Sequence, residues 1–339
     1  MLKMRAVKMK FLIILPAFVA LCAGGKILAV PGDNSHYVEG ESRHIWIPDG
    51  DGVSHLVDLQ ASIHKGSSGR GAYNQYWLYT RKNPQNHQLM VPYDHYSVWS
   101  SNYDGYKPTK VIVHGWGSNG DSQLNPMIRD ALLATGDFNV IVVDWGEVAG
   151  EFYTDSAAAV PSIGQHLGRF LQWLLNNFGG SWKNVHLVGF SLGAHIVGNA
   201  ARTVGGRVER ITGLDPAGPG WHRNSYALNR NDGVYVEAIH TDGGILGIFE
   251  PIGDVDFYPN GGRNPQPGCF PVGSCSHGRA YELFAASVRF NNFVGSECMS
   301  LDDVRNNNCK GASHNMGNID FDKRGSGLYS LTTGDTWPF

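Results

Sequence analysis

Short runs of β-branched and apolar residues recur through the middle of the chain and predict buried strands. They are TKVIVHG (109–115), NVIVVDW (139–145), NVHLVGF (184–190), ERITGLD (209–215) and VYVEAIH (234–240). Their apolar positions are nearly continuous instead of alternating, which is typical of central strands covered on both faces. The segment from about 30 to 80, with HIWIPDGDG and NQYWLYTRK, predicts antiparallel strands joined by polar turns.

Helical periodicity occupies the gaps between several of these strands. Segment 162–180 places its large apolar residues on one stripe and ends at Gly179, and segment 192–206 ends in the same way at Gly205. A third amphipathic pattern, GRAYELFAASVRF, covers 278–290. This alternation predicts an α/β protein with a mostly parallel central sheet and helices on both faces. Because 42% of the 339 residues are hydrophobic and no repeat or linker divides them, we expect one domain over 30–339.

The first residues have the layout of a secretory signal peptide. An apolar run from Phe11 to about Ala23 is too short to span a bilayer comfortably and follows a basic segment. The basic residues are Lys3, Arg5, Lys8 and Lys10. We therefore expect a signal peptide over 1–23, cleavage between 22 and 29, and a secreted, extracellular protein. Without these four residues the formal net charge of −3 becomes −7 and no basic tract remains, so we expect no nucleic-acid partner.

Four cysteines remain after the signal peptide, and an even number in an exported chain predicts two disulfides. They are Cys269, Cys275, Cys298 and Cys309. Three pairings are possible, and proximity in the sequence favours 269 with 275 and 298 with 309. The alternative, a metal site, lacks the C-x-x-C spacing that such sites use.

One serine lies between two glycines in GFSLG (189–193), after a buried strand and before a helix. This is the context of a nucleophile elbow on an α/β-hydrolase sheet, which lifts the serine hydroxyl out of the sheet. Gly189 and Gly193 have a steric purpose in such a turn, because it crowds the positions two before and two after the serine. The pattern predicts that Ser191 is a nucleophile; the alternative is a small residue in a tight connection.

A serine nucleophile needs a base, and the base needs a carboxylate that fixes its tautomer. Asp215 follows the strand RITGL and precedes Pro216, so we expect its carboxylate at the carboxyl edge of the sheet. Its alternative role is a turn cap before the proline. The histidines that follow are His222, His240, His277 and His314.

The first two of these histidines are poor candidates for the base. His222 is too near Asp215 to come from a separate loop, and His240 ends a strand that we expect in the core. His277 follows Cys275, which can clamp its loop, and precedes a helix, whereas His314 lies in a polar stretch. The residues alone favour His277 over His314 without excluding either.

The oxyanion that forms on an attacked ester needs two prepositioned donors. The backbone N–H of Leu192, which follows the nucleophile, is the expected first donor. VIVHGWG supplies the second, with Gly115 allowing close approach and Trp116 donating its N–H. The alternative for HGWG is a glycine turn with a core tryptophan.

These residues resemble the pancreatic lipase family of animals, particularly its insect members. The matching segments are VIVHGWG, VVDWGE, VHLVGFSLGAHIVG, ITGLDPAGP, VEAIHTD, DFYPNGG and CSHGRA, which in this order cover most of 105–290. The resemblance implies the α/β-hydrolase fold, a Ser191, Asp215, His277 triad and an oxyanion hole at Trp116 and Leu192. It implies hydrolysis of lipid esters by a lipase, an sn-1 phospholipase or a galactolipase, at a micelle, emulsion or membrane surface.

The chain departs from the family pattern at three places. Cys269 and Cys275 enclose only FPVGS where full triacylglycerol lipases carry a long lid, so we expect weak interfacial activation. We expect no C-terminal β-sandwich domain, no helper protein and a monomer. In NSYALNRNDGV, Asn229 stands where the family's calcium loop usually has a second carboxylate, although Asp232 is present. We therefore expect no metal and no cofactor, with calcium as the alternative.

Two other classes of function compete with the ester hydrolase. A silent lipid-binding or yolk-type storage protein can use the same scaffold, because fold does not establish function. It would lack the nucleophile, which is present here. A serine peptidase would need a polar cleft, whereas the expected loops carry apolar residues that suit acyl chains. Those residues are Trp116, Ile245, Leu246, Ile248, Phe249 and Phe270.

Overall fold

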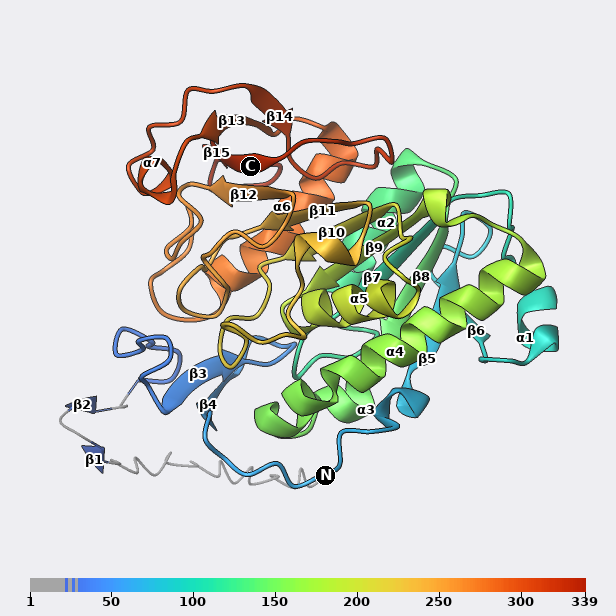
Figure 1. Cartoon of the computed structure of the whole chain (residues 1–339), viewed down its shortest axis with the longest axis horizontal. Helices are drawn as coiled ribbons and strands as arrows, with labels where there is room; N and C mark the ends of the chain where they lie inside the picture. Colours follow the sequence, from blue (N-terminus) through green and yellow to red (C-terminus); the bar gives the residue numbers. More distant parts are fainter. Residues whose placement is uncertain (1–21, 24–25, 28–29) are drawn as a thin grey trace, which may run out of the picture.

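The computed structural model describes residues 22–23, 26–27 and 30–339 (Figure 1). The expected signal peptide, residues 1–23, lies outside the described residues except for Cys22 and Ala23. These two form β1 (Cys22–Ala23), which pairs with β2 (Lys26–Ile27). Cleavage and export therefore stay predictions.

A mixed sheet of 11 strands forms the centre of the protein. Its strands are β5 (Gln75–Tyr79), β6 (Gln88–Met90), β7 (Thr109–Val113), β8 (Asn139–Asp144), β9 (Val185–Phe190), β10 (Arg210–Leu214), β11 (Tyr235–Ile239), β12 (Val255–Pro259), β13 (Val294–Cys298), β14 (Ser313–Asn315) and β15 (Gly327–Leu331). They lie in the order β14-β13-β15-β12-β11-β10-β9-β7-β8-β5-β6. Strands β8 through β15 in this order are parallel, and the outer strands are antiparallel. The predicted α/β-hydrolase class is confirmed.

Helices cover both faces of this sheet, as predicted (Figure 1). On one face, α4 (Tyr153–Phe178) and α5 (Leu192–Thr203) contribute to one apolar core; on the other, α2 (Leu124–Thr135) and α6 (Cys275–Phe290) contribute to a second. The shorter helices are α1 (His95–Trp99), α3 (Gly146–Ala149), α7 (Leu301–Arg305), η1 (Arg70–Tyr73), η2 (Trp182–Asn184) and η3 (Arg230–Asp232). Within the described ranges, none of the helices combines the length and the apolar character needed to cross a bilayer.

Two helices begin earlier than the sequence pattern predicts. Helix α4 begins at Tyr153, ahead of the periodic segment 162–180, and contains Pro161, which has no N–H to donate to the preceding turn. Helix α6 begins at Cys275, so His277 lies in its first turn and not in a loop before it. The position of His277 is therefore fixed both by the helix backbone and by the disulfide at Cys275.

The C-terminal part of the sheet was not predicted as strand. Strand β12 has the sequence VDFYP, whose Asp256 interrupts the apolar run, yet all five residues are buried. Asp256 accepts a hydrogen bond from His240 Nε2 at 2.8 Å, which explains how a carboxylate fits inside the sheet. Strand β15 pairs with β12 in parallel and with β13 in antiparallel register.

A separate hairpin lies at the end of the sheet where the parallel strands finish (Figure 1). It consists of β3 (His44–Pro48) and β4 (Ser54–Asp58), paired antiparallel. Its turn packs against the connection after β7, where the N–H of Gly50 donates to the C=O of Gly117 at 3.0 Å. The sequence predicted the antiparallel strands but not their position.

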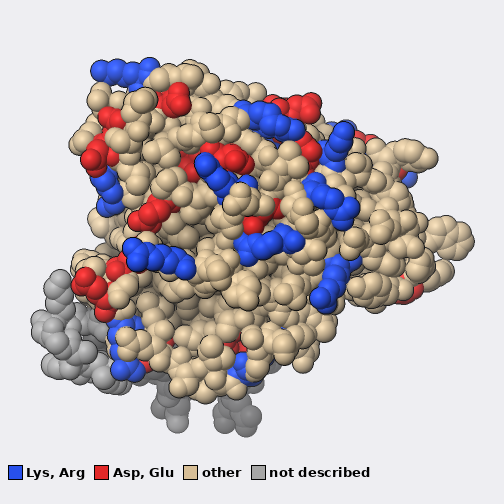
Figure 2. Space-filling model, viewed as in Figure 1, with Lys and Arg blue, Asp and Glu red and all other residues tan. Residues whose placement is uncertain are grey.

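Both disulfides that sequence proximity favoured are present. Cys269 bonds to Cys275 at the start of α6, and Cys298 bonds to Cys309 near the C-terminal strands. Figure 2 shows Lys and Arg interspersed with Asp and Glu over the face that carries α4 and α5. That face carries no continuous basic stripe of the kind that nucleic-acid-binding proteins present.

A buried ion cluster links the sheet to the segment after β14. Glu237 on β11 accepts hydrogen bonds from Arg210 on β10 and from Lys323, the latter at 2.7 Å, and its side chain has no exposed surface. Burial raises the pKa of Glu237, but the positive charges of Arg210 and Lys323 outweigh burial and lower this pKa to about 2. Arg210 also donates to the C=O groups of Asn318 and Asp320.

We expect Glu237→Gln to lower the free energy of unfolding by about 3–5 kcal/mol, because two buried cations lose their carboxylate. Asp302→Asn is the matched control, since Asp302 pairs with Arg305 and the two side chains are 79% and 45% exposed. It should cost less than about 1 kcal/mol. Urea unfolding of both variants measures the difference, and equal losses would contradict a structural role for the cluster.

Candidate active site

Ser191 occupies a strained turn between β9 and α5. Its backbone angles are φ 55° and ψ −122°, a conformation that residues other than glycine rarely adopt. Its N–H donates to the C=O of Leu214 at 3.0 Å, and its C=O accepts from Ala194 at 3.1 Å. These contacts hold the turn in place and leave the side chain at the carboxyl edge of the sheet.

Three glycines allow this turn to pack. A Cβ on Gly189 would lie 2.2 Å from the carbonyl oxygen of Gly193, and a Cβ on Gly193 would lie 2.2 Å from that of Val113. A Cβ on Gly115 would lie 3.0 Å from the Cβ of Ser191. The structure therefore shows the crowding that the sequence pattern predicted, including the close approach of the connection after β7.

Asp215 follows the neighbouring strand β10 and is fully buried. Its Oδ1 accepts the backbone N–H groups of Thr241 at 2.8 Å and Asp242 at 3.0 Å. Its Oδ2 lies 2.5 Å from Nδ1 of His277. The two amides fix one carboxylate oxygen, so the other faces the imidazole.

His277 reaches this carboxylate from the first turn of α6. With Nδ1 directed at Asp215, its Nε2 is the nitrogen that remains for another partner, and His277 and Ser191 line one cavity. In the described part of the chain no hydrogen bond joins Ser191 to His277. Catalytic hydrogen bonds are often long without substrate and tighten when it binds.

The two expected oxyanion donors lie beside Ser191. Leu192 is the first residue of α5, where helix N–H groups have no partner one turn earlier. The indole N–H of Trp116 donates to the C=O of Glu151 at 2.9 Å, which leaves the backbone N–H as its candidate donor. Among the described residues, neither backbone N–H has a protein acceptor.

The remaining histidines lie elsewhere. His314 is on β14, where its Nε2 lies 3.2 Å from the hydroxyl of Tyr235 and its ring stacks on Phe257. His240 is buried against Asp256. The structure thus brings His277, and not His314, to Asp215.

Two cavities meet at Trp116. The first, of about 380 Å³, is lined by Ser191, His277 and the hairpin turn 47–52. The second, of about 720 Å³, shares only Asp49 and Trp116 with it and is lined mainly by β4 and residues 150–155. Phe152, whose exposed fraction is 72%, and Tyr153 give the second cavity apolar walls.

Only some of the apolar residues that the sequence predicted around the site line its cavities. Leu246, Ile248 and Phe249 are buried in the protein and line neither cavity, because their loop folds inward after β11. Gly247 of that loop approaches Asp215 so closely that a Cβ would lie 2.3 Å from Oδ1. Phe270 is 83% exposed in the disulfide loop.

Asp242 is a buried group to which the sequence analysis gave no role. It has no exposed surface, and within the described chain neither of its side-chain oxygens has a hydrogen-bond partner. Burial and the neighbouring charge of Asp215 raise the pKa of Asp242 well above its usual value. The only sequence signal that could have placed Asp242 near the site is its position after β11, the strand next to the one that Asp215 follows.

Comparisons with known proteins identify the family of the chain. A family model described as Lipase matches residues 55–339. The chain belongs to the pancreatic lipase family. The lipase-family relatives include pancreatic lipase-related protein 2 of Homo sapiens, 32% identical over 262 residues, which cover 69% of this chain and 56% of that protein. Lipase member H-A of Xenopus laevis is 36% identical over 275 residues, covering 77% and 58%.

The chain spans about half the length of the curated lipases it matches. The predicted family is therefore confirmed, whereas its placement among the insect members stays a prediction. Among solved structures, the α/β hydrolase MGS-M1 from a Medee basin deep-sea metagenome is 16% identical, with a TM-score of 0.33. The aligned parts cover 56% of this chain and 69% of that one.

The calcium segment implied by the lipase family does not fit a cation here. Asp232 is fully occupied by Arg202, whose Nε and Nη2 donate to its two oxygens at 2.8 and 2.9 Å. The backbone N–H of Asn229 also donates to Asp232. A guanidinium thus supplies the positive charge at this carboxylate in place of a cation.

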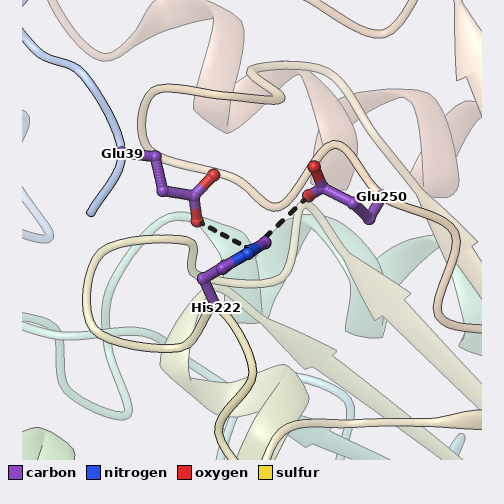
Figure 3. Close-up of side chains that lie close together, drawn as sticks. All are labelled: Glu39, His222 and Glu250. Atoms are coloured by element: carbon purple, nitrogen blue, oxygen red, sulfur yellow. Dashed lines mark ion pairs between the residues drawn. The ribbon is translucent and has the colours of Figure 1, made fainter. Parts of the chain in front are cut away.

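Two other clusters of side chains could offer metal ligands, and we assign a metal ion to neither. Asp215, Asp242 and His277 lie close together, but the direct contact of 2.5 Å between Asp215 and His277 leaves no space for an ion between them. Figure 3 shows the second group, in which Nδ1 of His222 lies 3.6 Å from Glu39 and 3.9 Å from Glu250. These side chains, of which Glu39 is part-buried and the other two are exposed, form a loose cluster that joins three loops.

His195 supports the site from one turn after Ser191. Its Nε2 lies 2.9 Å from the C=O of Ala217, and its Nδ1 accepts the N–H of Leu228 at 3.0 Å. Complete burial lowers the pKa of His195 to about 4, so the folded protein holds this imidazole neutral. The residue thereby fixes the chain that follows Asp215.

We expect this histidine to make the protein less stable in acid. The unfolded chain binds a proton at the usual pKa of 6.5 and the folded chain only near 4, so stability is full above pH 6.5 and falls down to about pH 4. The difference corresponds to about 3 kcal/mol. Unfolding free energies across this range measure it, and a His195→Gln variant with an unchanged pH slope would contradict it.

Proposed function

We propose that the protein is a serine hydrolase of lipid carboxylic esters, a lipase or an sn-1 phospholipase. The observation that carries this proposal is the contact of 2.5 Å between the buried Asp215 and His277, which lines the same cavity as Ser191. Chain order also supports it, because serine, acid and histidine follow one another as in α/β hydrolases. A storage protein would have no use for a strained serine beside an oriented imidazole.

In the first half of the reaction, the Ser191 oxygen attacks the ester carbonyl carbon while its proton passes to Nε2 of His277. The N–H groups of Leu192 and Trp116 stabilise the negative charge that forms on the carbonyl oxygen. The bond to the alcohol then breaks, and Nε2 returns the proton to the leaving oxygen. Asp215 stabilises the imidazolium through Nδ1.

In the second half, water replaces the alcohol. His277 takes a proton from the water, which attacks the acyl-serine carbonyl, and the proton then passes to Oγ of Ser191 as the fatty acid leaves. Burial and the charge of Asp215 raise the pKa of Asp242 well above its usual value, which favours the neutral form of Asp242. No cofactor takes part.

The second cavity supports a lipid as the substrate. Its volume of about 720 Å³ and the apolar walls at Leu56, Phe152 and Tyr153 suit an acyl chain that passes Trp116 from Ser191. The short loop closed by Cys269 and Cys275 contains no helix and cannot cover so large an apolar surface. The two disulfides accord with an exported protein. The proposal includes action on micelles, emulsions or membranes by a monomer.

We expect Ser191→Ala to abolish ester hydrolysis, with a loss on the order of 10⁶-fold in kcat. Asp215→Asn should lose about 10⁴-fold, because the imidazole loses its oriented tautomer and its counter-charge. A soluble uncharged ester such as p-nitrophenyl butyrate measures both, and circular dichroism verifies folding. Parent protein that binds lipid without turnover would identify a silent lipid-binding protein instead.

Because the loop between Cys269 and Cys275 is short, we expect turnover to rise smoothly through the solubility limit of a triacylglycerol. A lid that had to open at the interface would instead give a sharp jump at that concentration. Measured rates on tributyrin below and above saturation test this. A steep jump would show that some other segment acts as a lid.

A further inference from the structure

The cavity at Ser191 combines carboxylates and aromatic rings in a way that defines a class of substrate. We propose that it selects lipid esters with a quaternary ammonium head group, such as phosphocholine lipids, over lipids with anionic head groups. This inference rests on the proposed function, because the head group is placed by an ester held at Ser191. It concerns the rim of the cavity and not the reacting atoms.

The rim carries negative charge from two separate segments. Asp49 and Asp51 come from the turn of the β3–β4 hairpin, and Asp121 comes from the connection between β7 and α2. Among the described lining residues there is no Lys or Arg. Asp49 is paired with His55 at 2.8 Å, whereas Asp51 and Asp121 are exposed and, within the chain as described, form no ion pair.

Aromatic side chains line the same cavity. Trp116, Phe190 and Tyr281 are each partly exposed, and the rings of Phe190 and Tyr281 meet edge to face with their centres 5.3 Å apart. Rings and carboxylates together bind quaternary ammonium groups, because such a cation is weakly hydrated and has no N–H that needs a hydrogen-bond partner.

Ser191 fixes where the ester must lie relative to this rim. Ser191 lines the cavity and is only 8% exposed. In the described structure the Ser191 hydroxyl has no hydrogen-bond partner. With the acyl chain directed past Trp116 into the second cavity, the alcohol side of the ester remains in the first one. The head group therefore lies among the aspartates and the rings.

The expected preference is moderate, because the carboxylates are exposed to water and salt. A cation on an exposed aromatic face binds about two- to five-fold more tightly than a neutral group. Carboxylates within a Debye length, about 10 Å at 0.1 M salt, add attraction for a cation and repulsion for an anion. We expect about ten-fold discrimination in kcat/KM between the two head-group classes at low salt.

The test compares dihexanoyl phosphatidylcholine with dihexanoyl phosphatidylglycerol, both below their micelle concentrations so that surface charge plays no part. Each kcat/KM is divided by the value of the same variant for p-nitrophenyl butyrate. The parent should prefer the choline ester about ten-fold in 50 mM salt and clearly less in 500 mM. Asp51→Asn combined with Asp121→Asn should reduce the preference about three- to five-fold.

The matched control is Glu41→Gln combined with Asp322→Asn, which removes the same charge from two exposed residues that line neither cavity. It should keep the parent's preference. Equal preference in the parent, or equal loss in both double variants, overturns the inference while hydrolysis of p-nitrophenyl butyrate keeps the proposed function. If the folded parent cleaves none of the three esters, the proposed function itself fails.

Discussion

The catalytic geometry depends on how closely three backbone segments approach one another beneath Ser191. The turn after β9, the first residues of α5 and the end of β7 pack with no space for a side chain at Gly189 or Gly193. This contact lets Ser191 keep positive φ and places α5 with its free N–H groups at the nucleophile. The remaining parts of the site are positioned by their strands relative to that turn.

Parallel pairing carries this arrangement across the sheet. Ser191 follows β9 and Asp215 follows β10, and the backbone ladder continues past both strand ends through the bonds from Ser191 to Leu214 and from Asp215 to Ile239. Each side chain thus emerges at the same edge of the sheet. Two carboxyl groups are then buried together, and burial and the neighbouring charge of Asp215 raise the pKa of Asp242 well above its usual value.

The sequence was sufficient for the centre of the fold and for the residues that meet at its edge. The continuous apolar runs located β7 to β11, and the glycines around Ser191 identified the turn because sterics alone require them. It was insufficient where a tertiary contact decides the outcome. Asp256 enters a buried strand because His240 and the backbone N–H groups of Ile252 and Gly253 bond to its carboxylate. The burial of Asp242 is likewise visible only in three dimensions.

The hairpin β3–β4 forms walls of both cavities although it lies near the start of the sequence. It meets Gly117 well over fifty positions later, and Gly32, just before it, accepts the N–H of Gly273 in the disulfide loop. Contacts so distant in sequence carry a loop-closure cost that local contacts do not. A partly folded molecule without them lacks one wall of each cavity, so the pockets form only together with the tertiary structure.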